Sequence, residues 1–202
     1  MVMELAGMIS RSRFTQRDTR RRVALKSEKA RMANLFAYTC SFSVVAARQG
    51  AEVVFSVDTA KPCLNTGKTN FALNGLSETG QGKFIQEDVR KWLARQMRKR
   101  DQDQDAWAGY DLVVCDPPVF ASAKDGGQFS VEKEWPGLAE SCAGLLAADG
   151  AAIFANNHRT GDHRYYRKVL TEIFDSVTDL RPPLDFPVFT GRPHHVRTFW
   201  CE

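Results

Sequence analysis

Residues 32–58, MANLFAYTCSFSVVAARQGAEVVFSVD, constrain the fold of this chain more than any other stretch. A short apolar run, Met32 to Phe36, leads into a polar loop at Ala37 to Ser41. A small-residue segment with helical periodicity then ends at Gly50, and a second apolar run ends on Asp58. This order predicts a strand, a turn, a helix and a parallel strand.

The position of Asp58 indicates a nucleoside ligand. In open α/β sheets ligands bind at the carboxyl ends of the strands, and an acidic residue about 20 positions beyond the first turn accepts the ribose hydroxyls. The loop Tyr38-Thr39-Cys40-Ser41 has no GxGxxG pattern, so it gives little support for pyrophosphate binding. A nucleoside without a pyrophosphate fits better, and S-adenosylmethionine is the common one.

The alternation of strands and helices continues to the C-terminus. The two last extended segments, 176–180 and 195–201, have no helix between them, which predicts an antiparallel pair at one edge of the sheet. Further strands are expected at 83–86, 110–115 and 151–155, and helices at 62–74, 89–100, 131–146 and 162–174, with a turn at Asp149-Gly150 and a loop around Gly126-Gly127. We therefore expect an α/β fold of the class I methyltransferase (Rossmann-like) type, mostly parallel, with an antiparallel C-terminal strand and helices on both faces.

Length and composition bound the class of protein. A chain of 202 residues is expected to form one domain with a sizeable core. No apolar stretch approaches the ~20 residues of a membrane span, so a cytoplasmic protein without a membrane partner is expected. Five cysteines without CxxC spacing indicate reduced thiols, and no familiar zinc-ligand spacing is present, so no metal site is predicted.

Positive charge is concentrated at the N-terminus. The net charge is +4, and residues 1–31 hold nine Lys/Arg and three Asp/Glu. We expect a basic N-terminal segment at 1–30, packing through Phe14 and Val23 with a short helix over Val23 to Arg31, followed by a domain at 31–202. The basic segment suggests a polyanionic partner, and a solvated arm is the alternative. The basic face of the 89–100 helix is a second candidate contact for phosphates.

Three strings carry a resemblance to a known family: NLFAYTCSFSVVAARQGAEVVFSVDTAKPCLNTGKTNFALNGL, then FIQEDVRKWL, then YDLVVCDPPVFASAK. In order and spacing they resemble the S-adenosylmethionine-dependent methyltransferases that modify bases of 23S ribosomal RNA. That group includes cytosine-C5 enzymes and the guanine-N7 domain of a fused enzyme. The upstream FTQRDTRRRV is similar to the family's N-terminal string. The resemblance runs from about Phe14 to Asn157.

The resemblance implies a site for S-adenosylmethionine. Asp58 would hold the ribose, Asp88 the adenine amino group, and Asp116 the region beside the sulfonium. The other residues expected to line the cofactor are Phe36, Tyr38 and Thr39 on its methionine side, with Ser41, Thr59 and Val89 beside them. The alternative for Asp58 and Asp88 is that they cap strand ends, and for Phe36 and Tyr38 that they belong to the core.

Residue chemistry and charge also predict residues for the reaction and for contact with RNA, which is expected to be ribosomal RNA. The residues expected to carry the reaction are Asp116, Pro117, Pro118, Phe120 and Asn156, and Phe120 is expected to stack on the target base. RNA contacts are expected from Arg17, Arg20, Arg21, Lys124 and Arg159. Gln16, Arg17 and Arg20 match the N-terminal string, which would reach the cofactor carboxylate or the RNA.

Two departures from the family pattern bear on activity. Cys40-Ser41 stands where the family usually has Gly-Gly, which places a side chain where positive φ or close backbone approach is needed. Asn156-Asn157 stands where cytosine-C5 enzymes carry the cysteine that adds to the ring. Guanine N7 has an in-plane lone pair and needs no nucleophile from the protein, so alignment suffices. The two asparagines offer donors and acceptors to a base edge, or they cap the strand end.

Three hypotheses follow from the sequence. The first is an S-adenosylmethionine-dependent RNA methyltransferase acting at guanine N7 or another heteroatom. The second is a cytosine-C5 RNA methyltransferase with a displaced cysteine. The third is a catalytically inactive methyltransferase-like domain that binds RNA or a protein, which the Cys40-Ser41 loop favours.

Overall fold

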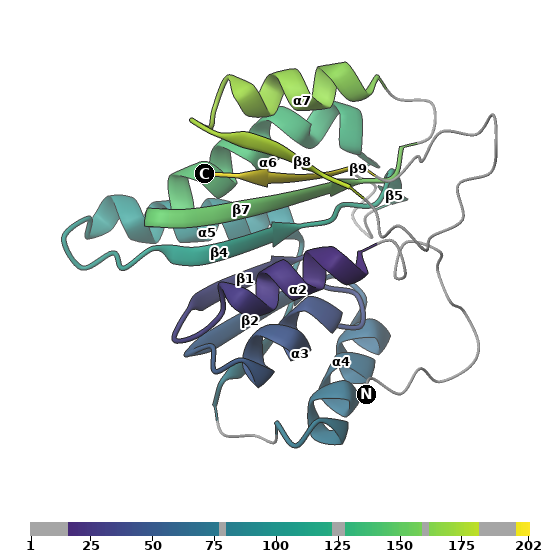
Figure 1. Ribbon diagram of the computed structural model, residues 1–202, viewed down its shortest axis with the longest axis vertical. Coiled ribbons are helices and arrows are strands. Elements are labelled where there is room, and N and C mark those ends of the chain that lie inside the picture. The colour runs from purple at the N-terminus through teal and green to yellow at the C-terminus, as the bar shows by residue number, and fades with distance from the viewer. Residues whose placement is uncertain (1–15, 77–79, 123–127, 159–161, 182–196) are drawn as a thin grey trace.

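A seven-stranded sheet forms the centre of the molecule (Figure 1). The computed structural model describes residues 16–76, 80–122, 128–158, 162–181 and 197–202. The strands of this sheet are β1 (Arg31–Leu35), β2 (Val53–Asp58), β3 (Gly82–Gln86), β4 (Tyr110–Cys115), β7 (Leu146–Asn156), β8 (Val177–Leu180) and β9 (Arg197–Cys201). Their order is β3-β2-β1-β4-β7-β9-β8. The first five are parallel, whereas β9 is antiparallel to both of its neighbours. The expected class I methyltransferase fold is confirmed.

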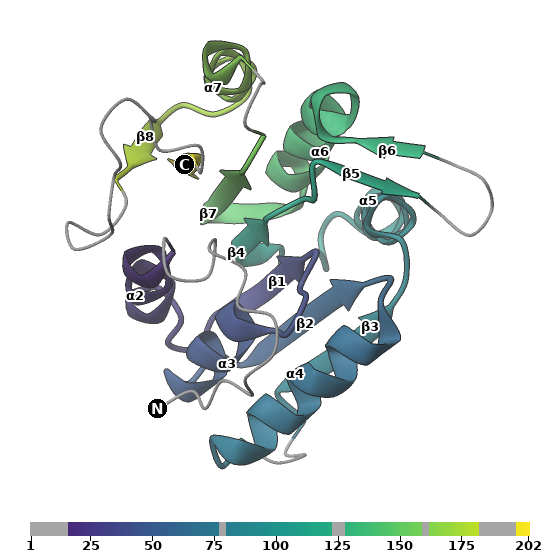
Figure 2. The same ribbon diagram turned by 90° about the vertical axis from the view of Figure 1, so that its right-hand side faces the viewer.

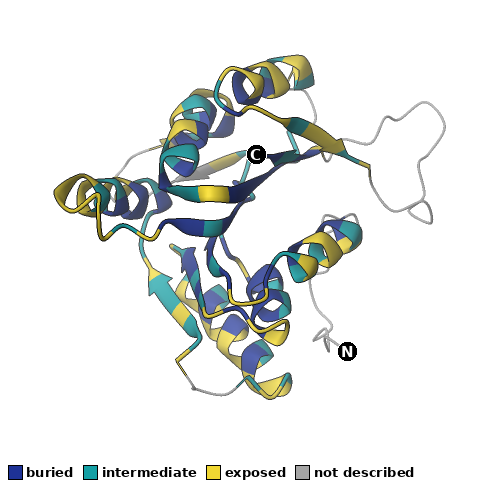
Figure 3. Ribbon diagram, turned by 60° about the vertical axis from the view of Figure 1, so that its left-hand side comes forward, coloured by how far each residue is buried: buried dark blue, intermediate teal, exposed yellow. Residues whose placement is uncertain are grey.

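Helices cover both faces of the sheet and bury two apolar clusters (Figure 2). One face carries α2 (Arg17–Leu25), α3 (Ser41–Arg48) and α4 (Lys61–Leu73), and the other carries α5 (Val89–Gln102), α6 (Val131–Leu145) and α7 (His163–Thr171). The inner strands are largely buried from both sides, whereas the edge strands β3 and β8 are partly exposed and the helices expose their outer faces (Figure 3). This burial explains why β4 is almost continuously apolar and why α5 is amphipathic.

The N-terminal helix lies earlier than expected. The expected helix over Val23 to Arg31 is wrong, because α2 spans Arg17–Leu25 and packs on α3. Val23 is fully buried, as expected, and the Ser27 hydroxyl donates a hydrogen bond to its carbonyl at 2.5 Å. Lys29 then adopts a positive φ of 58° and turns the chain into β1. Phe14 lies outside the described residues.

β7 begins before the expected turn. It starts at Leu146, directly after α6, and its pairing with β4 shifts register between Tyr110 and Leu112. The residues that were expected to form a turn, Asp149 and Gly150, therefore lie in an irregular part of the strand. The irregularity absorbs the extra residues of β7 opposite β4.

A small hairpin follows the two prolines after β4. It consists of β5 (Phe120–Ser122) and β6 (Gln128–Ser130), which pair antiparallel, and it leads into α6. This region was expected to be a loop. Three-residue strands are too short to carry a periodic pattern, so no local signal predicts them. Gly126 and Gly127 lie outside the described residues.

The loop between β1 and α3 is held in an unusual conformation. Phe36, Tyr38 and Cys40 have φ of 57°, 49° and 61°, and each such L-residue costs roughly 1–2 kcal/mol. The Ala37 N–H donates to the Val57 carbonyl at 3.0 Å, and the Cys40 N–H donates to the Ala37 carbonyl at 2.7 Å. The expected need for a positive φ at Cys40 is confirmed.

The Cys40 side chain points into the core rather than into the ligand cavity. It is fully buried, and it lies where a side chain at Gly67 of α4 would stand, since a Cβ there would be 2.9 Å from the Cys40 Cβ and closer still to Sγ. Burial raises the pKa of the Cys40 thiol to about 12. Gly67 thus makes room for the Cys40 side chain.

This packing predicts that Gly67 and Cys40 are energetically coupled. Gly67→Ala alone should destabilise the protein by about 2 kcal/mol through overpacking. In a Cys40→Gly background the same change should stabilise by about 1 kcal/mol, because alanine favours the helix. Urea unfolding of the two single variants and the double variant measures the coupling. Gly137→Ala is a matched control in α6, with no atom within 4 Å of its Cβ. Equal destabilisation by Gly67→Ala in both backgrounds would contradict the packing.

Candidate S-adenosylmethionine site

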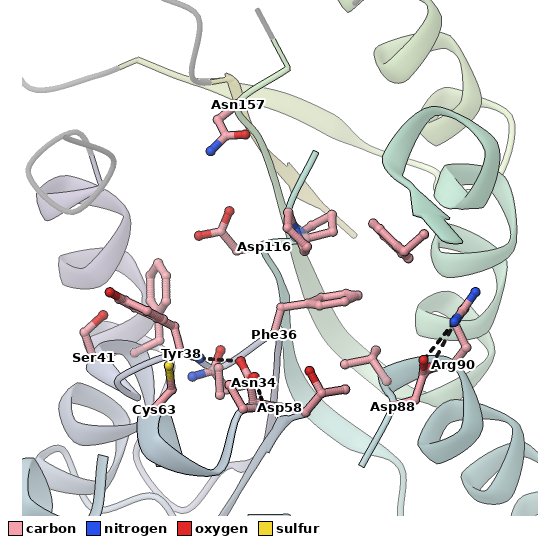
Figure 4. A pocket seen from close by; sticks show the side chains of 18 of the residues that line it. Asn34, Phe36, Tyr38, Ser41, Asp58, Cys63, Asp88, Arg90, Asp116 and Asn157 are labelled. Atoms are coloured by element: carbon pink, nitrogen blue, oxygen red, sulfur yellow. Dashed lines mark hydrogen bonds and ion pairs between the residues drawn. The ribbon is translucent and has the colours of Figure 1, made fainter. Parts of the chain in front are cut away.

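A cavity of about 560 Å³ opens at the carboxyl edge of the parallel strands (Figure 4). It is within the size range of small-molecule sites. Residues that follow β1, β2, β3, β4 and β7 all contribute to it, because parallel strands end at the same edge of the sheet. The lining residues are Gln16, Asn34, Phe36, Ala37, Tyr38, Ser41, Phe42, Asp58, Thr59, Ala60, Cys63, Asp88, Val89, Arg90, Asp116, Pro117, Pro118, Phe129 and Asn157.

Asp58 stands at the end of β2 and is fixed by backbone donors. Its Oδ2 accepts a hydrogen bond from the Tyr38 N–H at 2.8 Å, and its Oδ1 accepts one from the Ala60 N–H at 2.8 Å. Each carboxylate oxygen can accept a second bond. The geometry therefore leaves acceptors for two neighbouring hydroxyl donors, and Thr59 lines the cavity beside it.

The β1–α3 loop supplies one wall. Phe36 packs against Phe129 of β6, with 5.5 Å between ring centroids, and Tyr38 is partly exposed at the cavity. Ser41, the first residue of α3, also lines it. Thr39 does not: it is buried, and its carbonyl accepts a hydrogen bond from Asn70 Nδ2 at 3.0 Å.

Asp88 and Val89 form the corner between β3 and α5. Asp88 is the N-cap of α5 and accepts hydrogen bonds from Arg90. The hydrogen bond from the Arg90 side chain is the main cause that lowers the pKa of the Asp88 carboxyl. Val89 is the first helical residue, whose N–H has no acceptor within the helix. Together they present an acceptor and a donor side by side.

Asp116 and the two prolines after it form the corner at the end of β4. Burial raises the pKa of Asp116 to about 6, and a hydrogen bond from Gln16 opposes this shift. The Gln16 Nε2 lies 3.2 Å from Asp116 Oδ2, so the residue before α2 reaches the cavity. A carboxylate with little solvation favours a cation beside it.

The expected catalytic residues beyond the prolines are not all at the cavity wall. Asn157 lines the cavity, whereas Asn156 is buried, and its Oδ1 accepts a hydrogen bond from the His158 N–H at 2.8 Å. Phe120 is 69% exposed and does not line the cavity; its ring lies 6.1 Å from the His158 ring in an edge-on arrangement. The Asn156 oxygen therefore makes a strand-end capping contact, and Asn157 is the amide that lines the cavity.

The expected RNA-binding residues are placed only in part. Arg17, Arg20 and Arg21 lie on α2, where Asp18 pairs with Arg17 at 3.6 Å and with Arg21 at 3.3 Å. Lys124 and Arg159 lie outside the described residues.

The basic face of α5 is less available than expected. Arg90 pairs with Asp88 and Glu134, Arg95 pairs with Glu87, and Arg100 pairs with Asp101. Each pair neutralises a cation that was a candidate for phosphate contact. Phosphate contact by the remaining cations of α5, Lys91, Arg98 and Lys99, stays a prediction.

Several cavity residues were missed by the sequence reasoning. Asn34 is buried in β1 and donates from Nδ2 to the Ser43 hydroxyl at 2.8 Å, and the Ser56 hydroxyl lies 2.8 Å from the same oxygen. A polar residue inside an apolar strand was a visible signal for this one. Arg90 and Phe129 reach the cavity through contacts between distant segments, which local patterns do not reveal.

The cysteines do not offer a nucleophile at the prolines. Burial raises the pKa of Cys201 to about 12 and that of Cys115 well above its ordinary value. Cys142 is buried, and Cys63 lines the cavity from α4, beside Asp58. Among the described residues no cluster of three potential metal ligands is found, and none of the helices there has the length and apolarity to cross a membrane.

The residues present fit S-adenosylmethionine. Paired acceptors at Asp58 suit a ribose, the acceptor and donor at Asp88 and Val89 suit the edge of an adenine, and the carboxylate of Asp116 suits a sulfonium. Aromatic walls from Phe36 and Phe129 cover the flat parts of such a ligand.

Comparisons with known proteins agree with this geometry. A family described as S-adenosylmethionine-dependent methyltransferase matches residues 9–176. The ribosomal RNA large subunit methyltransferase K/L of Shewanella sp. (strain ANA-3) is 35% identical over 201 residues, which is 98% of this chain and 27% of that protein. The enzyme of the same name from Psychrobacter arcticus is 34% identical over 181 residues, covering 89% of this chain and 22% of that protein.

A solved structure extends the similarity to the fold. The crystal structure of SMU.776 complexed with SAH superposes with a TM-score of 0.81 at 26% identity, covering 96% of this chain and 50% of that one. The chain spans about a quarter of the length of the curated relatives that it matches. Because the family model matches most of this chain, the chain belongs to the S-adenosylmethionine-dependent methyltransferases.

Proposed function

We propose that this chain transfers a methyl group from S-adenosylmethionine to a nitrogen of a base in large-subunit ribosomal RNA, with guanine N7 as the favoured atom. The observation that carries the proposal is the substrate side of the cavity, which holds Asp116, Pro117, Pro118 and the Asn157 amide but no cysteine. Support for the RNA comes from the relatives, which are named as large-subunit ribosomal RNA methyltransferases. Action on ribosomal RNA would place the chain in the cytoplasm.

In this proposal the chain holds the cofactor from three corners. Asp58 accepts the ribose hydroxyls, Asp88 and Val89 bind the adenine edge, and Asp116 lies beside the sulfonium. The remaining wall residues of the cofactor site are Phe36, Tyr38, Ser41 and Thr59. Thr39 supports the loop through its carbonyl instead of touching the ligand.

The cofactor supplies an electrophilic methyl group on a sulfonium. The protein's task is to align a base nitrogen with it and to exclude water, which is catalysis by proximity and orientation. Asn157 presents its amide to the base edge, while Pro117 and Pro118 bound the space and Phe120 stacks on the base from the rim. Asn156 acts indirectly, by fixing the turn that carries Asn157 and His158.

The cytosine-C5 alternative is less well supported. It needs a thiolate beside the target ring. Cys115 is fully buried with a raised pKa, and Cys63 lies at the ribose end of the cavity.

The inactive-domain alternative rested on the Cys40-Ser41 loop. The Cys40 side chain is buried away from the cavity, and the cavity is open beside it. This geometry supports a loop that leaves room for the cofactor in the cavity. The basic α2 helix, with Arg17, Arg20 and Arg21, is the described surface that we propose for RNA contact.

We expect the purified chain to methylate protein-free large-subunit ribosomal RNA in vitro and to yield 7-methylguanosine. Nucleoside digestion followed by mass spectrometry identifies the product. Asp58→Asn should reduce the yield at least about tenfold, because it replaces an acceptor facing two N–H donors by an amide. Asp179→Asn, on the far edge strand β8, is the matched control. Detection of 5-methylcytidine as the product would reject the guanine assignment. Absence of methylation in any RNA would favour the catalytically inactive domain that binds RNA or a protein.

The position of Asp116 predicts a pH dependence that separates the charged cofactor from its neutral product. Below pH about 6 Asp116 is protonated and no longer attracts a sulfonium, so affinity for S-adenosylmethionine should fall roughly three- to tenfold between pH 7.5 and pH 5. Affinity for S-adenosylhomocysteine, which has no sulfonium, should not follow this dependence.

Calorimetric titrations of both ligands at the two pH values measure the difference, and Asp116→Asn should abolish it. Asp149→Asn, at an exposed position, is the control. The same pH dependence for both ligands would show that Asp116 does not face the sulfonium.

A further inference from the structure

Among the described residues that line the cavity, Arg90 is the basic one. Its backbone N–H and its Nε donate to Asp88 Oδ1 at 2.8 Å and 3.1 Å, and its Nη2 donates to Oδ2 at 2.8 Å. Figure 4 shows the two side chains facing each other at one end of the cavity. Such a forked contact fixes both the position and the plane of the carboxylate.

Arg90 is itself held from the other side. Its Nη1 donates to Glu134 Oε1 at 3.1 Å, and its guanidinium lies 5.8 Å from the centre of the Phe129 ring. Phe129 in turn packs on Phe36. One side chain therefore joins the start of α5 to α6 and to the β5–β6 hairpin. These contacts hold the Arg90 side chain, and with it the Asp88 carboxylate, in a single orientation.

The orientation of Asp88 determines what the cavity accepts at this end. An ionised carboxylate only accepts hydrogen bonds, and the two bonds to Oδ1 leave the remaining acceptor capacity on Oδ2. The hydrogen bonds from Arg90 keep the pKa of Asp88 below its ordinary value, so the group stays ionised. Next to it the Val89 N–H is a donor.

We propose that Arg90 is a positioning residue that makes the cavity select a purine with an amino group at its 6-position. The 6-amino group and N1 of adenine match the fixed acceptor of Asp88 and the donor of Val89. A 6-oxo purine places an acceptor against the carboxylate and an N1–H against the N–H, so both contacts fail. Rejection by unpaired polar groups is the strong form of selectivity. This inference rests on the proposed function, in which Asp88 and Val89 bind the adenine edge.

The test compares S-adenosylhomocysteine with S-inosylhomocysteine by calorimetric titration. The wild-type protein should prefer the adenosyl ligand by at least about 100-fold. Arg90→Ala should weaken S-adenosylhomocysteine at least about tenfold and reduce the preference to below about tenfold. Arg90→Lys keeps the positive charge at the start of α5 but loses the two-pronged guanidinium contact with Asp88. It should therefore give an intermediate preference even if the alanine variant is unstable. Arg95→Ala, which removes a cation from the same helix and its pair with Glu87, should retain the wild-type preference.

The outcomes separate this inference from the proposed function. An unchanged preference in both Arg90 variants overturns it, and so does an equal loss of affinity for both ligands, which would indicate a purely structural role. Absence of S-adenosylhomocysteine binding by the folded wild-type protein would instead reject the proposed function, and the inference with it.

Discussion

The hydrogen bond between the Tyr38 N–H and the Asp58 carboxylate joins the carboxyl ends of the neighbouring strands β1 and β2. It forms because the loop after β1 turns through three residues with positive φ, which directs its N–H groups toward β2. The same contact orients the acidic group and shapes the wall of the cavity beside it. Without it, the strained loop would lose a bond that offsets the cost of its left-handed residues.

The cost of that loop is distributed over neighbouring elements. Asn70 of α4 donates to the Thr39 carbonyl, the Ala37 N–H reaches β2, and Gly67 leaves the space that Cys40 fills. A side chain can therefore stand at a position that favours glycine, provided that the facing helix gives way. Cys40 in the loop and Gly67 in α4 therefore depend on each other in packing.

The sequence predicted most of the fold because its signals were local. Buried parallel strands such as β4 are continuous apolar runs, and helices such as α5 have a period of 3.6 residues. The parallel direction of most strands and the acidic residues at their ends followed from the α/β alternation. The β5–β6 hairpin and the early start of β7 were missed, because short strands and irregular pairing leave no periodic pattern.

The details of the site depended on contacts that no local pattern encodes. Which of Asn156 and Asn157 faces the cavity is set by the alternation of side chains along β7, where Asn156 shares the buried face of Phe154. The ion pair between Arg90 and Glu134 links residues 44 positions apart and holds Arg90 at the cavity wall. Gln16 reaches Asp116 across 100 positions.

The central claim is that this cavity binds S-adenosylmethionine despite the unusual loop. Calorimetric titration of the purified wild-type protein with S-adenosylmethionine, at pH 7.5 and alongside a circular dichroism spectrum, tests it most directly. The structure predicts saturable binding of one ligand per chain with a dissociation constant in the micromolar range. This corresponds to a binding free energy on the order of −8 kcal/mol. A folded protein that shows no heat of binding at millimolar ligand would contradict it.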